Sequence, residues 1–539
     1  MITQLICPTC NKRTELLSER VIGTGTISQK LKCGHNQYIK KLSKESEEDN
    51  LRKVCSEITS FEGDKLFQHQ TECVLFTLLK ANGRICIFDE VGVGKTIETI
   101  IPIVLRKKEM LPALVVCKSI AKMNWMKHWL NWGETFAQII ESSKDKWFEK
   151  FPVHIISYEM LRRITENGNN NNHKTVLDSK KTIIADESHL IKNDTSGRTK
   201  TIKTLCENKP FVFMLSGTQV ENISSELFPV FNIVRPDRFH NRDRFLHSYW
   251  EMYRDGWGYK VGKMLCPEKF KQDTTDFVIR RKMDDVLPNL PPVRRNNLFV
   301  ELGDKVKGLY DAEVTKFSKF YNQNKGTMNN FEFMSNILAK LNILRQITGM
   351  AKVESGVDFT EEFLDGNDRK LVIFVHHHRV AELYTTHLSK LLSSRKLDEL
   401  AFLRAKDIQN AENILDEFKN NTRRRVLLAS TQASGQSINM QFCSDCLLSE
   451  RQWTPSKEEQ AGVGRFRRPG QKNTINFNYL IAVGTVDEHL TSIIERKIRH
   501  IAQIDAGYKG ESAPWEESSI LKELAELLAN SGDSKWKLK

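Results

Sequence analysis

The stretch RICIFDEVGVGKTIETI, residues 84–100, indicates the fold class of this chain. Its first residues, RICIF, form a short continuous apolar run, which is typical of a strand buried on both faces of a parallel sheet. The residues that follow the turn, KTIETIIPIVLR, have the pattern of a helix, and Gly92 and Gly94 lie in the turn. A strand, a glycine-containing turn and a helix in this order predict an α/β nucleotide-binding domain.

The turn is similar to a phosphate-binding loop, although Asp89 occupies the position of the first glycine in G-x-x-x-x-G-K-[ST]. At a helix N-terminus, free N–H groups and the helix dipole favour an anion, and glycine lets the backbone approach its oxygens. We expect Lys95 to neutralise the β- and γ-phosphates of ATP and Thr96 to ligate magnesium; a chance Gly-Lys-Thr is the alternative. The residues expected around the phosphates are Glu90, Val91, Gly92, Val93, Gly94, Lys95 and Thr96.

A second apolar run, in KTIIADESHL at residues 181–190, ends in two carboxylates. Ligands of open α/β sheets bind at the C-terminal ends of strands, where Asp186 and Glu187 are expected to lie. Asp186 suits the magnesium shell, and Glu187 suits the activation of an attacking water. The alternative is an acidic turn after a strand, but the preceding phosphate loop favours the catalytic interpretation.

Two series of strand and helix patterns divide the chain. The first contains ALVVC, VHIIS, TIIA and FVFML, and the second contains LVIFV, LAFLR, RVLLA and INFNYLI. Such alternation predicts two parallel-sheet domains of the α/β class. We assign residues 61–295 to the first lobe, with a helical insertion at about 225–290, and residues 296–500 to the second, with a helical start at about 300–350.

Composition points to a polyanion as partner. Lys and Arg number 81 and Asp and Glu 68, so the net charge is +13. No apolar run approaches the ~20 residues of a membrane span, and the N-terminus lacks the apolar core of a signal peptide. We therefore expect a soluble intracellular protein. Its eleven cysteines are then expected to be reduced thiols or metal ligands rather than disulfides.

The two ends of the chain are expected to form small additional elements. Residues 1–45 contain Cys7-x-x-Cys10 and Cys33-x-His35, a ligand set that suits tetrahedral zinc and predicts a zinc-ribbon-like module; free reduced thiols are the alternative. Residues 46–60 are densely charged and are expected to form a linker or a solvated helix. Within residues 501–539, an apolar stripe predicts a helix that packs on a lobe or binds a partner. The stripe consists of Ile520, Leu521, Leu524, Leu527 and Leu528.

The motifs together resemble those of superfamily-two helicases, and specifically the Swi/Snf-like branch of DNA translocases. FDEVGVGKT and ADESH resemble motifs I and II, and FQHQTECVLFTLL places Gln70 where the family recognises adenine. ALVVCKSIAKMNWMKHW resembles motif Ia, IISYEML motif Ib, MLSGTQVEN motif III, KLVIFVHHHRVAEL motif IV, LLASTQASGQSINM motif V, and SERQWTPSKEEQAGVGRFRRPGQ motif VI. The resemblance implies two tandem RecA-like lobes and an ATPase driven by ATP and magnesium.

The resemblance also implies roles for residues of the second lobe. Arg465 and Arg468 match the family's two arginine fingers, which would meet phosphate oxygens when the lobes close. The candidate DNA contacts are Lys118, Thr431, Gln432 and Trp453, although Gln432 departs from the family pattern and Trp453 is as consistent with a core position.

The function implied is ATP-driven translocation on double-stranded DNA. The alternatives are a strand-separating helicase, the motor subunit of an antiviral defence complex and a non-hydrolysing DNA-binding scaffold. A protein partner could bind through the zinc module or the C-terminal helix. The compact lobes suggest a cytoplasmic protein of a bacterial nucleoid or of a virus-infected cell.

Overall fold

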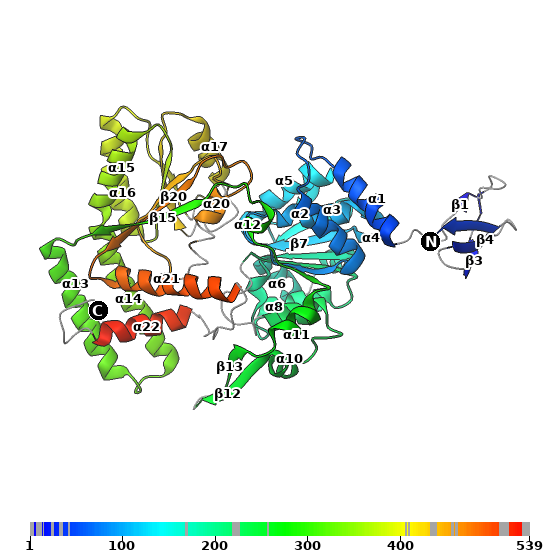
Figure 1. The fold of residues 1–539 in the computed structure, drawn as a ribbon, viewed down its shortest axis with the longest axis horizontal. Helices are drawn as coiled ribbons and strands as arrows, with labels where there is room; N and C mark the ends of the chain where they lie inside the picture. The colour runs from blue at the N-terminus through cyan, green and yellow to red at the C-terminus, as the bar shows by residue number, and fades with distance from the viewer. Residues whose placement is uncertain are drawn as a thin grey trace.

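The computed structural model describes residues 5–530, except for fourteen short segments that are not discussed structurally. These are residues 7–12, 15, 23–25, 32–35, 41–43, 168–170, 218–226, 256–257, 405–406, 408–409, 432–438, 454–457, 459–461 and 506–516. The described chain contains two parallel sheets with helices packed against them (Figure 1). The predicted α/β class with two parallel-sheet lobes is therefore confirmed.

The first sheet has seven strands in the order β14-β6-β11-β10-β7-β9-β8, and all of its pairings are parallel. The five predicted runs are its central strands, and their side chains are almost all buried because helices cover both faces. The short edge strands β8 and β14 were not predicted. The strands are β6 (Arg84–Ile87), β7 (Ala113–Cys117), β8 (Ala137–Ile139), β9 (Val153–Ser157), β10 (Thr182–Asp186), β11 (Phe211–Leu215) and β14 (Val278–Ile279).

Alternate residues of these strands point into two separate hydrophobic clusters. Ile85 and Val115 lie in the cluster covered by α2, α3 and α5, whereas Cys86 and Val116 lie in the cluster covered by α6 and α8. The sheet is thus buried on both faces, which leaves its C-terminal edge as the place for polar groups. The helices are α1 (Lys44–Glu57), α2 (Gln68–Leu75), α3 (Lys95–Leu105), α4 (Lys107–Met110), α5 (Lys122–Gly133), α6 (Tyr158–Asn167), α7 (Asn171–Ser179) and α8 (Gly197–Cys206).

The insertion in the first lobe contains a β-hairpin that the sequence analysis did not predict. β12 (Trp250–Asp255) pairs with β13 (Gly258–Met264) in antiparallel fashion and projects from the lobe (Figure 1). Trp250 anchors its base, because its ring lies 5.1 Å from that of Phe245. An Asp-Gly pair between two strand-forming runs is a hairpin signal that was overlooked. The helices of the insertion and the connection are α9 (Phe228–Val234), α10 (Arg242–Tyr249), α11 (Pro267–Thr274) and α12 (Met283–Val286).

The second sheet has six parallel strands in the order β15-β20-β19-β16-β18-β17. Four of them are the predicted runs, and β15 and β19 are additional. The strands are β15 (Val293–Val300), β16 (Leu371–Val375), β17 (Ala401–Leu403), β18 (Val426–Ser430), β19 (Asp445–Leu448) and β20 (Ile475–Ala482). The helices are α13 (Asp304–Asn324), α14 (Asn330–Ala351), α15 (Val353–Gly366), α16 (His378–Ser394), α17 (Ala411–Asn420), α20 (Val463–Phe466), α21 (Val486–Asp505) and α22 (Glu517–Asn530).

The N-terminal segment contains short antiparallel strands. β1 (Leu5–Ile6) pairs with β2 (Arg13–Thr14), and β3 (Leu16–Ile22), β4 (Thr26–Leu31) and β5 (Asn36–Lys40) form a three-stranded sheet. The four predicted zinc ligands, Cys7, Cys10, Cys33 and His35, lie outside the described residues. Within the described residues, no group of three or more His, Cys, Asp or Glu side chains could hold a metal ion.

The predicted apolar stripe near the C-terminus lies on α22. This helix packs on α13 and α14, and Ile520, Leu521, Leu524 and Leu528 are buried in their common cluster. Leu527 is 42% exposed, so it stands apart from the rest of the stripe. No helix in the described part of the chain is long and apolar enough to cross a membrane.

We expect Leu524→Ala to lower the free energy of unfolding of the second lobe by about 2–5 kcal/mol, since Leu524 is fully buried and its removal leaves a cavity. The matched control is Leu527→Ala on the same helix, which should change it by less than about 0.5 kcal/mol. Urea denaturation followed by circular dichroism measures both. Equal losses in the two variants would contradict this packing.

Candidate ATP site

The loop between β6 and α3 has the geometry that the sequence predicted. Gly92 and Gly94 adopt positive φ angles of 95° and 111°, which favour glycine. A Cβ at Gly92 would lie 2.8 Å from Met283 Cε, and a Cβ at Gly94 would overlap the side chain of Gln70. Both glycines are therefore required for close packing as well as for conformation.

Gln70 belongs to this site by position. It is 2% exposed, and its Oε1 accepts a hydrogen bond of 3.0 Å from the backbone N–H of Phe67 at the start of α2. Its amide nitrogen faces Gly94. Gln70 thus joins the N-terminus of α2 to the loop, beside the partly exposed ring of Phe67.

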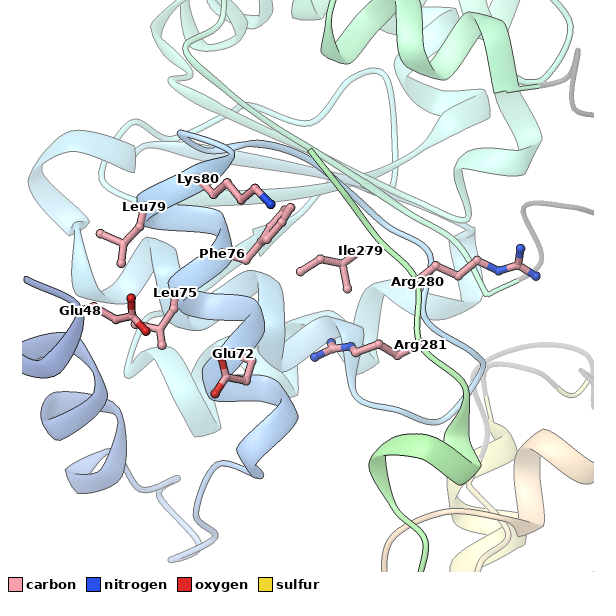
Figure 2. Close-up of a pocket in the computed structure, with 9 residues that line it drawn as sticks. All are labelled: Glu48, Glu72, Leu75, Phe76, Leu79, Lys80, Ile279, Arg280 and Arg281. Carbon is pink, nitrogen blue, oxygen red and sulfur yellow. The ribbon is translucent and has the colours of Figure 1, made fainter. Parts of the chain in front are cut away.

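Asp89, which replaces the outer glycine of the strict pattern, forms a buried ion pair. Its carboxylate is fully buried and accepts a hydrogen bond of 2.9 Å from Arg281 Nε, with a second bond from Arg281 Nη2. Arg281 follows β14, and Figure 2 shows its side chain extending toward α2, in the direction opposite to that of Arg280. The aspartate therefore contacts protein, and its side chain is directed away from the expected phosphate position.

Lys95 lies across the loop. Its Nζ donates hydrogen bonds of 2.7 Å to the carbonyl of Asp89 and 3.0 Å to that of Glu90. Burial lowers the pKa of Lys95, and the carboxylates of Glu187 and Asp186 oppose the shift. The ammonium thus lies between the loop and the acidic end of β10.

Asp186 ends β10 and is held by donors from two elements. One carboxylate oxygen accepts a hydrogen bond of 2.8 Å from Trp125 Nε1 of α5, and the other accepts one of 2.9 Å from the N–H of Glu187. The hydroxyl of Tyr158 donates to the backbone carbonyl of Asp186 at 2.8 Å. Burial and the neighbouring Glu187 carboxylate raise the pKa of Asp186 to about 6.

Glu187 adopts a left-handed conformation, with a φ of 55°, that turns its side chain toward His189. The Nδ1 atom of His189 lies 3.2 Å from Glu187 Oε2 and 3.1 Å from the hydroxyl of Ser216. Burial alone would raise the pKa of Glu187, but His189, Lys118 and Lys95 lower it to about 2. Glu187 is therefore an ionised carboxylate, oriented by motifs II and III.

Arg465 and Arg468 of the second lobe lie at this edge of the first lobe. Arg465 is 4% exposed, and burial lowers its pKa to about 10 while the Glu187 carboxylate opposes the shift. Arg468 Cγ lies 3.4 Å from the position of a Cβ on Gly92. Burial, and then repulsion from Arg465, lower the pKa of Arg468 to about 9. Arg465 is thus desolvated, whereas Arg468 is only partly buried, and its Nε donates a hydrogen bond of 2.8 Å to the carbonyl of Gly464.

Two further contacts join the lobes. Arg467 pairs with Asp284 in the connection and donates a hydrogen bond of 3.3 Å to the carbonyl of Pro291. Lys127 of α5 pairs with Glu412 of α17. These contacts bring motif VI against the segment that links the two sheets.

The described candidate DNA contacts differ in their surroundings. Lys118 lies close to Glu187 in the ATP site. Thr431 is 6% exposed, and its hydroxyl lies 3.2 Å from His376 Nδ1. Trp453 is 6% exposed and packs 4.3 Å from the Arg345 guanidinium in the helical cluster, so its placement agrees with the core alternative. Gln432 lies outside the described residues.

Several site residues were not singled out from the sequence. Trp125, Tyr158 and His189 lie in motifs Ia, Ib and II, whereas Arg281 lies in the connection, and the contacts of all four join different elements. A tryptophan on an apolar helix face is interpreted as a core residue. The sequence pattern does not show which acceptor its indole N–H bonds. Only the motif membership of His189 offered a signal.

Comparison with known proteins agrees with this geometry. Residues 67–352 match the model of the SNF2-related domain. The chain is 25% identical to the SWI/SNF-related matrix-associated actin-dependent regulator of chromatin subfamily A-like protein 1 of Xenopus tropicalis, over 83% of this chain and 46% of that protein. It is also 25% identical to the human DNA annealing helicase and endonuclease ZRANB3, over 80% of this chain and 40% of that protein. The chain thus spans less than half the length of these two relatives.

A solved structure is also similar. The Sulfolobus solfataricus SWI2/SNF2 ATPase core in complex with dsDNA is 21% identical, with a TM-score of 0.37, over 88% of this chain and 95% of that one.

We expect Trp125→Phe to lower the rate of ATP hydrolysis by about 10-fold, because losing a hydrogen bond to a carboxylate costs about 1.5–3 kcal/mol while the ring still fills the core. The matched control is Trp129→Phe on the same helix. Trp129 is equally buried, and its Nε1 has no hydrogen-bond partner among the described residues. Steady-state hydrolysis by both variants tests the assignment, and equal effects would contradict it.

Proposed function

The chain belongs to the SNF2-related domain family, and on this premise we propose that it is a DNA-stimulated ATPase that translocates along double-stranded DNA. The observation that carries the proposal is the convergence of two half-sites. Lys95 and Glu187 come from the first lobe, and the buried Arg465 and the partly buried Arg468 come from the second. A site divided in this way couples hydrolysis to closure of the lobes.

Nucleotide binding exchanges contacts within the loop. The ammonium of Lys95 now bonds two loop carbonyls, and the oxygens of the β- and γ-phosphates would accept the same hydrogen bonds. The free N–H groups at the start of α3 would bind phosphate as well. Gln70, which packs on Gly94 at the start of α2, would hydrogen-bond adenine.

The donor set fits a magnesium ion, which the phosphates would share. Hard oxygen ligands suit this cation, and the carboxylate of Asp186 and the hydroxyl of Thr96 are the groups that would hold it. When bound, the ion would neutralise charge on the phosphate oxygens. The Trp125 and Glu187 N–H donors keep the Asp186 carboxylate in one orientation.

Glu187 is the group that would orient and deprotonate the attacking water. Its depressed pKa, about 2, keeps it ionised, and His189 fixes its position through a shared contact with Ser216. Because Ser216 follows β11, the water-activating carboxylate is linked to the end of a neighbouring strand. Movement of the C-terminal end of β11 would therefore displace Glu187.

Arg465 and Arg468 would stabilise charge on the transferred phosphoryl group. An anion between the two guanidiniums would accept hydrogen bonds from both, so bound ATP would favour the closed arrangement of the lobes. Loss of an arginine finger typically lowers turnover by about 10³-fold or more. Hydrolysis followed by release of phosphate would remove the shared anion and allow the lobes to separate, which would move one grip on DNA relative to the other.

The DNA grip is expected to be electrostatic. The chain carries a net charge of +13, and phosphate contacts carry no sequence information. We therefore propose that duplex DNA of any sequence stimulates the ATPase. The human relative is named a DNA annealing helicase, which is consistent with action on duplex DNA.

The test measures ATP hydrolysis with duplex DNA, single-stranded DNA or no DNA, alongside displacement of a third strand from a triplex. We expect duplex DNA to stimulate ATP hydrolysis and the protein to displace the third strand of the triplex. Both activities should fall by orders of magnitude between about 50 and 200 mM salt.

Lys95→Ala should abolish hydrolysis, whereas Glu187→Gln should keep ATP binding and stop turnover. Wild-type turnover in Lys95→Ala, or no stimulation by any DNA, would overturn the proposal.

The hairpin β12–β13 supports one alternative function, the separation of DNA strands. It projects from the first lobe, and Tyr253 on it is 47% exposed, so an aromatic ring is available to stack on a base (Figure 1). A forked duplex added to the same experiment decides between the two. Efficient unwinding that is lost in Tyr253→Ala would favour strand separation, and unwinding by neither protein would favour translocation.

We also propose that the N-terminal module binds one zinc ion through Cys7, Cys10, Cys33 and His35. Three thiolates and an imidazole are a tetrahedral ligand set, and so short a segment needs such a staple. We expect purified protein to contain one equivalent of zinc by metal analysis. The Cys7→Ser/Cys10→Ser variant should lose it, and undiminished zinc in that variant would contradict the assignment.

A further inference from the structure

The phosphate-binding loop is attached to the connection between the lobes along its first residues. The N–H groups of Cys86, Phe88 and Glu90 donate hydrogen bonds of 2.8, 2.8 and 3.0 Å to the carbonyls of Phe277, Ile279 and Arg281. The N–H of Met283 donates to the Glu90 carboxylate at 2.6 Å. The strand pairing thus continues beyond β6 and β14 to the loop itself.

Arg281 is the side chain that closes this attachment. Its Nη2 donates to both buried carboxylates, to Glu98 Oε1 at 2.6 Å and to Asp89 Oδ2, and its Nη1 donates to the carbonyl of His69. Asp89 and Glu98 are both fully buried. One guanidinium thus joins the start of the loop, the first turns of α3 and the start of α2.

The charges make this guanidinium necessary. Two carboxylates buried side by side repel each other, and both accept hydrogen bonds from the one guanidinium of Arg281. Burial by itself would lower the pKa of Arg281, but the carboxylates of Glu98 and Asp89 raise it above the ordinary value. Removing one partner of such a group leaves an uncompensated buried charge.

The same residues contact the groups that would meet ATP. The carbonyl of Asp89 accepts the hydrogen bond of Lys95 at 2.7 Å, and Glu98 lies one turn after Lys95 on α3. His69, whose pKa burial lowers, donates from Nε2 to the carbonyl of Val93 within the loop at 3.0 Å. A shift of Arg281 would therefore move both sides of the loop.

We infer that Arg281 is a positioning residue, which holds the phosphate-binding loop in its ATP-binding shape through Asp89, Glu98 and the His69 carbonyl. This inference rests on the proposed ATPase and assigns a function to a residue that touches neither nucleotide nor DNA. Arg281 precedes α12, where Asp284 pairs with Arg467 of the second lobe. The loop is thereby fastened to the segment that moves with lobe closure.

The test compares Arg281→Gln with Arg280→Gln. Arg280 is the adjacent residue, is exposed, and extends in the direction opposite to that of Arg281 (Figure 2). We expect Arg281→Gln to raise the Kd of a fluorescent ATP analogue and the KM for ATP about 10-fold, equivalent to about 1.4 kcal/mol, and to change kcat at saturating ATP and DNA by less than about 3-fold. Arg280→Gln should leave Kd and KM unchanged.

A third variant, Arg281→Lys, distinguishes positioning of the loop by the guanidinium from simple compensation of charge. A single ammonium lacks the planar fork that bonds two carboxylates and a carbonyl together, so we expect only partial rescue of KM. If Arg281→Gln does not fold, Glu98→Met, which has a similar volume and no oxygen acceptor, replaces it and should raise KM several-fold, because Arg281 then holds Asp89 alone. An unchanged Kd in the folded variant, or a fall confined to kcat, would overturn the inference.

The two proposals fail in different ways. If the unmodified protein binds the analogue and does not hydrolyse ATP, the proposed ATPase is wrong, while the Kd comparison between Arg281→Gln and Arg280→Gln still decides the positioning function. If hydrolysis is normal and the two arginine variants have equal Kd values, the positioning function is wrong and the ATPase stands.

Discussion

The structure depends on the need to pair charges buried at the C-terminal edge of the first sheet. Helices cover both faces of that sheet, so its polar groups gather at this edge with little access to water. A buried charge without a partner costs several kcal/mol. Asp89 and Glu98 share Arg281, whereas Glu187 has His189 and Lys95 nearby. The arrangement of the loop follows from how these few charges are compensated.

The same constraint explains why the site is divided between lobes. Arg465 is buried, Arg468 is partly buried, and both lie against the first lobe, which under the proposed function brings positive charge to the phosphate oxygens. Two guanidiniums side by side repel each other, and a shared anion removes that repulsion. Binding of an anion at the site and closure of the second lobe against the first would therefore favour each other.

The β12–β13 hairpin shows that packing against other elements can decide the conformation of a segment. The sequence analysis assigned a helical insertion to about residues 225–290, yet β12 and β13 pair within it as far as Asp255 and Gly258. Trp250 and the surrounding phenylalanines fix the base of the hairpin, and that packing cannot be read from spacing. The C-terminal stripe is a simpler case, because its period matched a helix and most of its members are buried.

The amino-acid sequence by itself determined the two parallel sheets and the residues of the phosphate loop. Continuous apolar runs identify buried strands, and Gly-Lys-Thr after such a run specifies a strand–turn–helix, because both are local properties. Only the tertiary structure decided the partners of Asp89, the hydrogen bond from Trp125 to Asp186 and the burial of Trp453. These contacts join residues far apart in the chain. Whether a side chain is a core residue or a site residue depends on which neighbours the fold brings to it.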